Sequence, residues 1–154
     1  SAQEMADAVL ARVETTDLLI GAAAVADFRP AEAADQKIKK TPGQEELLVR
    51  LVRNPDILAE VAAHRDQTGR PRVVVGFAAE TQDLLANAAA KLTAKKLDLI
   101  VANDVTEPGS GFGADDNRVT LLFADGRQEP LPIMSKAEVA DRVLAAVLPM
   151  LQRD

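Results

Sequence analysis

Hydrophobic and polar positions follow two different periods along the chain, and their succession predicts an α/β domain. Apolar residues at helical spacing near the start predict a helix over residues 2–13. Residues 17–26, Asp-Leu-Leu-Ile-Gly-Ala-Ala-Ala-Val-Ala, form a continuous apolar run, as in a parallel central strand that is buried on both faces. A helix is the competing interpretation of this Ala-rich run, but its short length and Gly21 favour a strand.

Further alternation of predicted helices and strands follows. Asn54 is predicted to cap a helix that has Pro55 at its first position and runs to about His64. Strands are predicted over 72–76 and 97–102, with a helix over 81–96 between them that begins near Glu80 or Thr81. After a Gly-rich loop over 104–117, the pattern predicts strands 119–123 and 129–131 around the turn Asp125-Gly126, and a last helix capped by Ser135.

Residues 37–53 are predicted to form a hairpin that projects as a flap. Its arms, Lys37–Lys40 and Glu46–Arg53, flank Thr41-Pro-Gly-Gln44, where the Pro-Gly pair marks a turn. The second arm partly alternates, and its exposed apolar side needs a cover such as a homodimer contact. The whole order predicts a Rossmann-like open α/β sheet with a parallel centre, an antiparallel edge hairpin and a projecting dimerisation flap.

Length and composition narrow the class of protein. The 154 residues fit a single domain over 1–154, and a pattern that opens on a helix suggests that a strand-turn-helix upstream is missing. The absence of Cys and the single His64 argue against disulfides, Cys-ligated metals and Ser-His-Asp catalysis, and suit a reducing cytoplasm. The net charge of −6 argues against nucleic-acid binding, and no apolar run is long enough to span a membrane.

Three predicted strands end in residues that suit a ligand site. In open α/β sheets, ligands bind outside the carboxyl ends of the strands, and the strand ends here are Ala26-Asp27-Phe28, residues 76–80 and Ala102-Asn103-Asp104. The helix that begins near Asn54 offers backbone amides at the same rim. Because Asp56 would repel a phosphate, a nucleobase or a ribose is expected at that helix end.

Two groups of lysines are candidates for binding an anion. Lys91 and Lys95 lie four residues apart on one predicted helix face, and their repulsion would be offset by an anionic ligand. The helix dipole explains lysines near a helix end equally well. Lys37, Lys39 and Lys40 have a solvated surface as their alternative, and Asp27 could be a turn residue. His64 is assigned no role. Asp115-Asp116-Asn117 could be a metal motif or a turn, and a turn is favoured. No dinucleotide-binding motif and no Walker A motif is present.

The motifs, taken together, resemble those of a known family. The segments that carry the resemblance, in chain order, are Ala23-Ala-Val-Ala-Asp27-Phe-Arg-Pro, Lys37-Ile-Lys-Lys40, Asn54-Pro-Asp-Ile57, Val75-Gly-Phe-Ala-Ala-Glu-Thr81, Lys91 to Lys95 followed by Asp98 and Ile-Val-Ala-Asn103, and Gly111-Phe with Asp116-Asn-x-Val119. This set, which covers nearly the whole chain, resembles bacterial phosphopantothenoylcysteine synthetase, the C-terminal half of the bifunctional coenzyme A biosynthesis protein.

The resemblance implies a CTP-dependent ligase. In that family, CTP and Mg²⁺ activate the carboxylate of 4′-phosphopantothenate as an acyl-cytidylate, and cysteine then displaces CMP. Carried over, the CTP site falls on Asp27, Lys37, Asp56, Ile57, Leu58, Ala59, Phe77, Lys91 and Lys95. Lys37 would be the catalytic residue, Lys91 and Lys95 would hold the triphosphate, the segment from Asp56 to Ala59 would receive the base, and Asp27 would hold the ribose-phosphate region or the metal.

The resemblance also implies parts beyond this chain. In the family the flap reaches across a homodimer, an upstream Gly-rich segment with an Asn handles the acyl-cytidylate, and FMN belongs to a separate decarboxylase half. The alternative function is a non-catalytic nucleotide-binding or dimerisation module of a larger protein.

Overall fold

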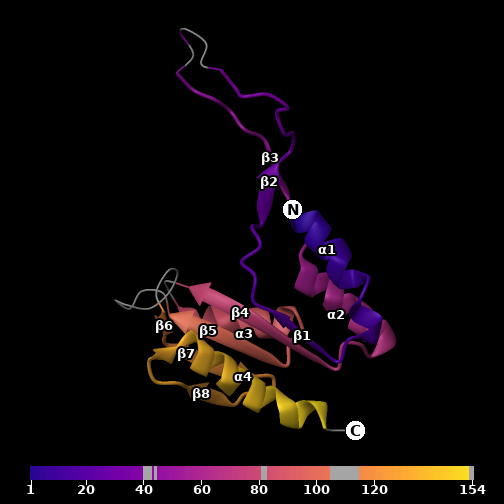
Figure 1. Ribbon diagram of the computed structural model, residues 1–154, viewed down its shortest axis with the longest axis vertical. Coiled ribbons are helices and arrows are strands. Elements are labelled where there is room, and N and C mark those ends of the chain that lie inside the picture. The colour runs from indigo at the N-terminus through magenta and orange to yellow at the C-terminus, as the bar shows by residue number, and fades with distance from the viewer. Residues whose placement is uncertain (40–42, 44, 81–82, 105–114, 153–154) are drawn as a thin grey trace.

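A mixed five-stranded sheet forms the body of the molecule, and a long flap projects from it (Figure 1). The computed structural model describes residues 1–39, 43, 45–80, 83–104 and 115–152. The sheet has the order β1-β4-β5-β7-β8. Its strands are β1 (Leu18–Gly21), β4 (Val73–Glu80), β5 (Leu99–Asp104), β7 (Val119–Phe123) and β8 (Gln128–Pro130).

The sheet has the predicted parallel centre and antiparallel edge. β4 pairs in parallel with both β1 and β5, whereas β7 and β8 run antiparallel. The predicted turn at Asp125-Gly126 joins the last two strands, with Gly126 at φ 88° and the amide of Arg127 donating to Asp125 Oδ1 at 3.0 Å. The α/β fold class predicted from the pattern is therefore confirmed.

Helices cover the two faces of the sheet, because apolar residues alternate along the central strands. Val74, Ile100 and Leu122 point into one core, which α1 (Ala2–Leu10), α2 (Ile57–Thr68) and α3 (Leu84–Ala94) cover. Val75, Val101 and Leu121 point into the other core, below α4 (Lys136–Leu151). Strands buried on both faces read as continuous apolar runs, which is why their positions could be predicted.

Several predicted boundaries at the start of the chain were wrong. The first helix ends at Leu10 and is followed by a 3₁₀ turn, Val13–Thr15. The run over 17–26 forms a strand only over Leu18–Gly21, and this strand is parallel as predicted but lies at the sheet edge, half-buried instead of central. The residues after Gly21 leave the sheet, and residues 23–26 line a pocket, with Val25 also packed against the core below α2.

The later elements are also displaced from their predicted bounds. β4 continues to Glu80, so residues 77–80 belong to the strand and not to a turn after it. β5 covers Leu99–Asp104 instead of 97–102. α3 begins at Leu84 behind Asp83, which has φ 46°, whereas Thr81 lies outside the described residues, as does most of the predicted Gly-rich loop.

The capping of α4 confirms the prediction for Ser135. The Ser135 hydroxyl accepts from the amide of Glu138 at 3.3 Å, and the Glu138 carboxylate accepts from the Ser135 hydroxyl and amide. These hydrogen bonds, chiefly that from the hydroxyl, lower the pKa of Glu138. Before this helix, β6 (Asp116–Asn117) pairs with β9 (Met134–Ser135), so Asp116 and Asn117 are strand residues and not a turn.

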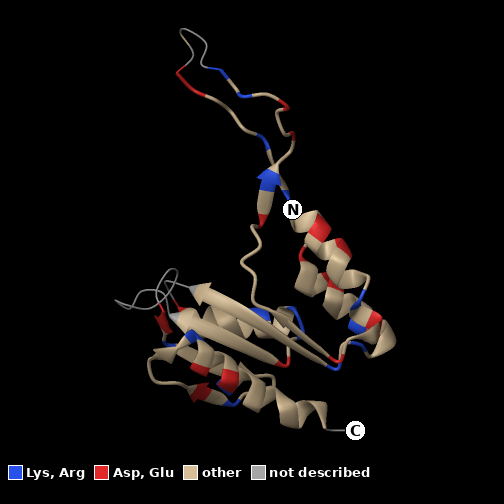
Figure 2. Ribbon diagram, viewed as in Figure 1, with Lys and Arg blue, Asp and Glu red and all other residues tan. Residues whose placement is uncertain are grey.

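The flap is paired at its root and not along the predicted arms. β2 (Phe28–Pro30) and β3 (Leu51–Arg53) form an antiparallel ribbon, while the described residues between them have no helix or strand. Lys37 and Lys39 lie on this projecting part, whereas Lys40 and most of the predicted turn, Thr41, Pro42 and Gln44, lie outside the described residues. Figure 2 shows that the flap carries charges of both signs.

Candidate functional site

A pocket of about 700 Å³ opens at the carboxyl ends of β1 and β4, below the root of the flap. Open α/β sheets bind ligands at this position because neighbouring chain segments diverge there. The pocket is lined by four parts of the chain: Met5, Val9, Leu19, Ile20, Gly21 and residues 23–28; Arg53 and residues 54–58; residues 77–79; and Lys91 with Lys95.

Two glycines make room for side chains that pack on β1 and β4. Gly21 and Gly76 are paired neighbours in β1 and β4, and both lie under the side chain of Leu58. A Cβ atom added at Gly21 would lie 3.1 Å from Leu58 Cδ2, and one added at Gly76 would lie 2.6 Å from Leu97 Cδ1. The missing side chain of Gly21 thus makes room for the first turn of α2 above the sheet, and that of Gly76 makes room for Leu97.

Asn54 joins the pocket wall to the flap root and is not the helix cap that was predicted. Its Nδ2 donates to the Ala26 carbonyl at 2.7 Å, and its amide donates to the Asp27 carbonyl at 2.8 Å. Its Oδ1 accepts from Arg29 Nη1 at 3.1 Å, and Arg29 also donates to the Arg53 carbonyl at 2.7 Å. This network fixes the segment that carries Asp27 against the start of α2.

The N-cap of α2 is Asp56, two residues later than predicted, and the helix runs on to Thr68 instead of ending near His64. Asp56 Oδ1 accepts from the Ala59 amide at 3.2 Å. Ile57 is buried in the core, while Leu58 lies across the strand ends. Asp56, Ile57 and Leu58 line the pocket. Ala59 is not among the lining residues, and its backbone amide donates to the cap residue Asp56.

Lys91 and Lys95 both line the pocket from α3, as their spacing predicted for a common helix face. Lys95 Nζ lies 3.0 Å from Asp56 Oδ1. The two groups expected at the phosphate end and at the base end are therefore in direct contact. The positive charge expected to bind phosphate and the negative charge expected beside the base are therefore adjacent, and Asp56 partly neutralises Lys95.

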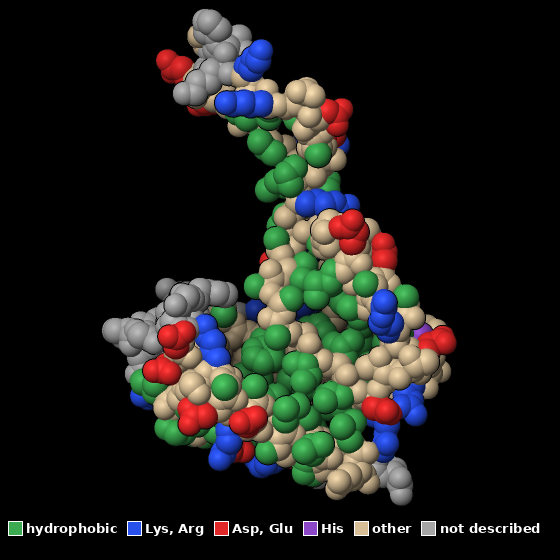
Figure 3. Space-filling model, viewed as in Figure 1, with side chains coloured by type: hydrophobic (Ala, Val, Ile, Leu, Met, Phe, Trp, Pro, Cys, Tyr) green, Lys and Arg blue, Asp and Glu red, His purple; other side chains and the backbone are tan. Residues whose placement is uncertain are grey.

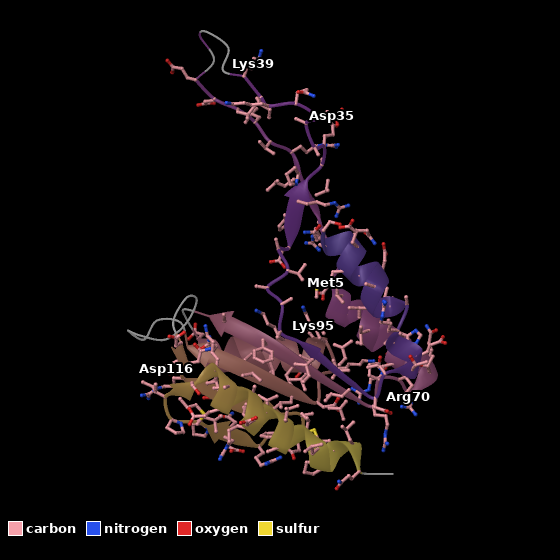
Figure 4. The ribbon with its side chains drawn as sticks, in the orientation of Figure 1. Met5, Asp35, Lys39, Arg70, Lys95 and Asp116 are labelled. Atoms are coloured by element: carbon pink, nitrogen blue, oxygen red, sulfur yellow. The ribbon has the colours of Figure 1, made fainter. Side chains whose placement is uncertain are left out.

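Not every predicted site residue reaches the pocket. Asp27 and Phe77 line it, and Phe77 is 39% exposed. Lys37 does not line it: it lies on the flap between Asp35 and Lys39, whereas Lys95 and Met5 lie on the body below the flap root (Figure 4). Asn103, at the third strand end, is also not among the lining residues.

Some lining residues were not predicted to belong to a site. Met5 and Val9 were predicted as the apolar face of a helix, and an apolar stripe gives no signal that separates core from pocket wall. Arg53 lines the pocket at the end of β3, and its place directly before Asn54-Pro55 was the available signal. The wall that these residues make is mostly apolar, and its charged members are Asp27, Arg53, Asp56, Lys91 and Lys95.

For a metal, the described residues offer carboxylates but no closed site. Within the described ranges, no three His, Cys, Asp or Glu side chains come together as a metal cluster. Mg²⁺ commonly takes one or two protein carboxylates with the phosphates of a substrate, and Asp27 in the pocket wall fits that pattern.

Among the described residues, no helix is long and apolar enough to cross a membrane.

Comparison with known proteins gives matches over nearly the whole chain. The family model described as DNA/pantothenate metabolism flavoprotein C-terminal domain matches residues 1–150. The coenzyme A biosynthesis bifunctional protein CoaBC of Vibrio vulnificus (strain CMCP6) is 48% identical over 147 residues, 96% of this chain and 36% of that protein. Its counterpart in Bacillus subtilis (strain 168) is 47% identical over 147 residues, 96% of this chain and 35% of that protein.

A solved structure agrees with these matches. The crystal structure of the C-terminal domain of coenzyme A biosynthesis bifunctional protein CoaBC superposes with a TM-score of 0.76 at 35% identity, covering 100% of this chain and 66% of that one. The chain thus spans about a third of the length of the curated relatives that it matches.

Proposed function

Since the chain belongs to the family of DNA/pantothenate metabolism flavoprotein C-terminal domains, we propose that it acts as the ligase which joins 4′-phosphopantothenate and cysteine at the expense of CTP. Support comes from its relatives, whose names assign them to coenzyme A biosynthesis. The observation that carries the proposal is the pocket at the strand ends, where Lys91 and Lys95 face the first turn of α2.

The proposed reaction has two steps. The carboxylate oxygen of 4′-phosphopantothenate attacks the α-phosphorus of CTP, and pyrophosphate leaves with the electrons of the broken P–O bond. The amine of cysteine then attacks the acyl carbon of the acyl-cytidylate, CMP leaves, and the amine loses a proton as the amide forms. Both steps move negative charge onto phosphate oxygens, so cations near the phosphates stabilise the transition states.

The pocket offers a role for each of its charged groups. Lys91 and Lys95 hold the triphosphate as point charges. The backbone amides at the start of α2, next to Ile57 and Leu58, receive the base and ribose. Asp27 holds Mg²⁺ together with the phosphates, and the ion supplies charge neutralisation there. Lys37, which is exposed on the flap, reaches a pocket when the flap lies over it, and there acts in the acyl transfer.

The nucleotide preference tests this function. In calorimetric titrations, CTP is expected to bind at least about tenfold more tightly than ATP, GTP or UTP, because hydrogen-bonding groups that are left unpaired by the wrong base lose affinity. Equal affinity for the four nucleotides would contradict the proposal. Binding of CTP without turnover of 4′-phosphopantothenate and cysteine would instead favour the alternative, a non-catalytic nucleotide-binding or dimerisation module.

A homodimer through the flap accounts for the position of Lys37. Leu47, Leu48 and Val49 are 57%, 93% and 57% exposed, and such an apolar arm requires a cover. Hydrophobic side chains are visible along the flap in Figure 3. We propose that two flaps cross, so that Lys37 of each chain serves the pocket of the other.

Substituting the most exposed of these leucines tests the dimer. Leu48→Asp is expected to weaken dimerisation at least about tenfold in sedimentation velocity, because it places a charge in the apolar contact. Ile133→Asp, at a side chain that is 47% exposed and outside the flap, is the matched control and should leave the dimer intact. A monomeric parent protein at working concentration would rule out this use of the flap.

A further inference from the structure

The contact between Lys95 and Asp56 lies inside the candidate site and calls for a physical explanation. Lys95 Nζ is 3.0 Å from Asp56 Oδ1, and both side chains line the pocket. Lys95 lies at the end of α3 and Asp56 caps α2, so the contact spans two helices. Of the two lysines that line the pocket, Lys95 is thus already paired with a carboxylate.

This ion pair is accessible enough to be exchanged. The side chain of Lys95 is 29% exposed and that of Asp56 is 51% exposed. Ion pairs with this much contact with water are weak, since water solvates both partners when they separate. A polyphosphate brings several charges to one lysine and therefore competes well with a single carboxylate.

The cap of α2 does not depend on the lysine. Asp56 Oδ1 accepts both from Lys95 Nζ and from the Ala59 amide, the latter at 3.2 Å. If Lys95 turns toward a ligand, the hydrogen bond from Ala59 stays and the first turn of α2 remains capped. The exchange therefore requires the movement of one side chain and not the unwinding of a helix.

We propose that Asp56 is an internal anion that occupies Lys95 until an anionic group of the ligand displaces it, and that Asp56 thereby lowers the affinity of the site for polyphosphate. When the ligand leaves, Asp56 takes Lys95 back, which favours release. The inference rests on the proposed function in assigning a polyphosphate to this pocket. It makes no use of the identity of the base.

A second ion pair on the same helices provides the control. Lys96 Nζ lies 2.5 Å from Asp66 Oδ2, and it too joins the end of α3 to α2. These side chains are 60% and 53% exposed and are not among those that line the pocket. Neutralising Asp66 removes the same charge from the same helix as neutralising Asp56, without freeing a lysine in the pocket.

The test is calorimetric titration of the protein with inorganic triphosphate at low ionic strength. Asp56→Asn keeps a good N-cap residue and is expected to bind about two- to fivefold more tightly than the parent, which corresponds to the strength of a partly exposed ion pair. Asp66→Asn should bind like the parent. Circular dichroism and thermal unfolding check that the helices are unchanged.

The pair Lys95→Gln and Lys95→Gln with Asp56→Asn separates exchange from simple repulsion. If Asp56 acts through Lys95, its neutralisation brings no gain once Lys95 is replaced. An equal gain in that background, an equal gain in Asp66→Asn, or no gain in Asp56→Asn would each overturn the inference. If neither Lys95→Gln protein binds measurably, Lys95 is required, and the comparison of Asp56→Asn with Asp66→Asn decides. Because the probe has no base, failure of CTP preference leaves this test unaffected.

Discussion

Lys37→Ala is expected to lower the rate of ligation by about 100- to 1,000-fold, the loss typical when one donor to a developing negative charge is removed. The side chain is exposed on the flap and contributes nothing to the core. Its removal should therefore leave the circular dichroism spectrum and the unfolding midpoint unchanged. Separate measurements of the rates of pyrophosphate release and amide formation show which of the two steps is slowed when the lysine is removed.

Lys39→Ala is the matched control for this experiment. It removes the same charge two residues further along the same flap, where Figure 4 shows Lys39 well away from the body. Its rate is expected to remain close to that of the parent, because it is not among the residues proposed to bind CTP. Equal losses in both variants would assign the effect to the overall charge of the flap, and unchanged turnover in Lys37→Ala would make the lysines solvated surface.

Asp98→Ala is expected to lower the free energy of unfolding by about 2–4 kcal/mol, because it leaves the Val74 amide without its acceptor and the partly buried Arg65 guanidinium without its counter-charge. Arg65 keeps only its hydrogen bonds to the carbonyls of Arg72 and Lys96. Asp98 accepts from Arg65 at 2.8 and 3.0 Å and from the Val74 amide at 2.8 Å. The two side chains are 24% and 27% exposed. The network ties α2 to the starts of β4 and β5.

The neighbouring ion pair again supplies the comparison. Asp66→Ala breaks the contact with Lys96, in which both partners are more than half exposed, and exposed pairs contribute about 0–1 kcal/mol. Urea unfolding of the two variants, with equal m-values, gives the difference directly. If Asp98→Ala lost no more stability than Asp66→Ala, the Arg65–Asp98 network would contribute no more to stability than an exposed ion pair.

The strands that could be predicted from the sequence are those whose apolar residues have only one use. Val73–Val75 and Leu99–Val101 point into the two cores in turn, so their pattern reports burial alone. The residues after Gly21 are as apolar, yet they line a pocket. Since a core and a pocket wall require the same side chains, hydrophobicity predicted a strand over 17–26, whereas the observed strand covers only Leu18–Gly21.

The predicted cap of α2 failed because two suitable residues stand close together. Asn54 and Asp56 are both good N-cap residues, and the choice depends on what else each can bond. Asn54 finds the carbonyl of Ala26 and Arg29, which lie 28 and 25 residues away in sequence. Asp56 is thereby left to cap the helix. Local preferences could not decide between them, because the partner belongs to the flap root.

The site was only partly accessible to sequence reasoning for the same reason. Spacing placed Lys91 and Lys95 on one helix face, and strand ends indicated Asp27. Phe77 lay in a strand end that was also indicated, but its role in binding CTP, like that of the segment from Ile57 to Ala59, came from the family resemblance. The contact of Lys95 with Asp56 could not be predicted, because it depends on how α2 and α3 lie on the sheet.

The hydrogen bonds of Arg29 and Asn54 fix the direction of the flap at its root, beside the pocket. β2 and β3 hold the root, and each arm beyond it has about ten residues, which reach roughly 30 Å when extended. A rotation of about 5° at the root then moves the tip by roughly 2.5 Å, comparable with the distance over which an ion pair forms or breaks. In the proposed dimer, the accuracy with which Lys37 reaches the partner's pocket would therefore depend on the fit of the Arg29 and Asn54 side chains, 8 and 17 residues away from it.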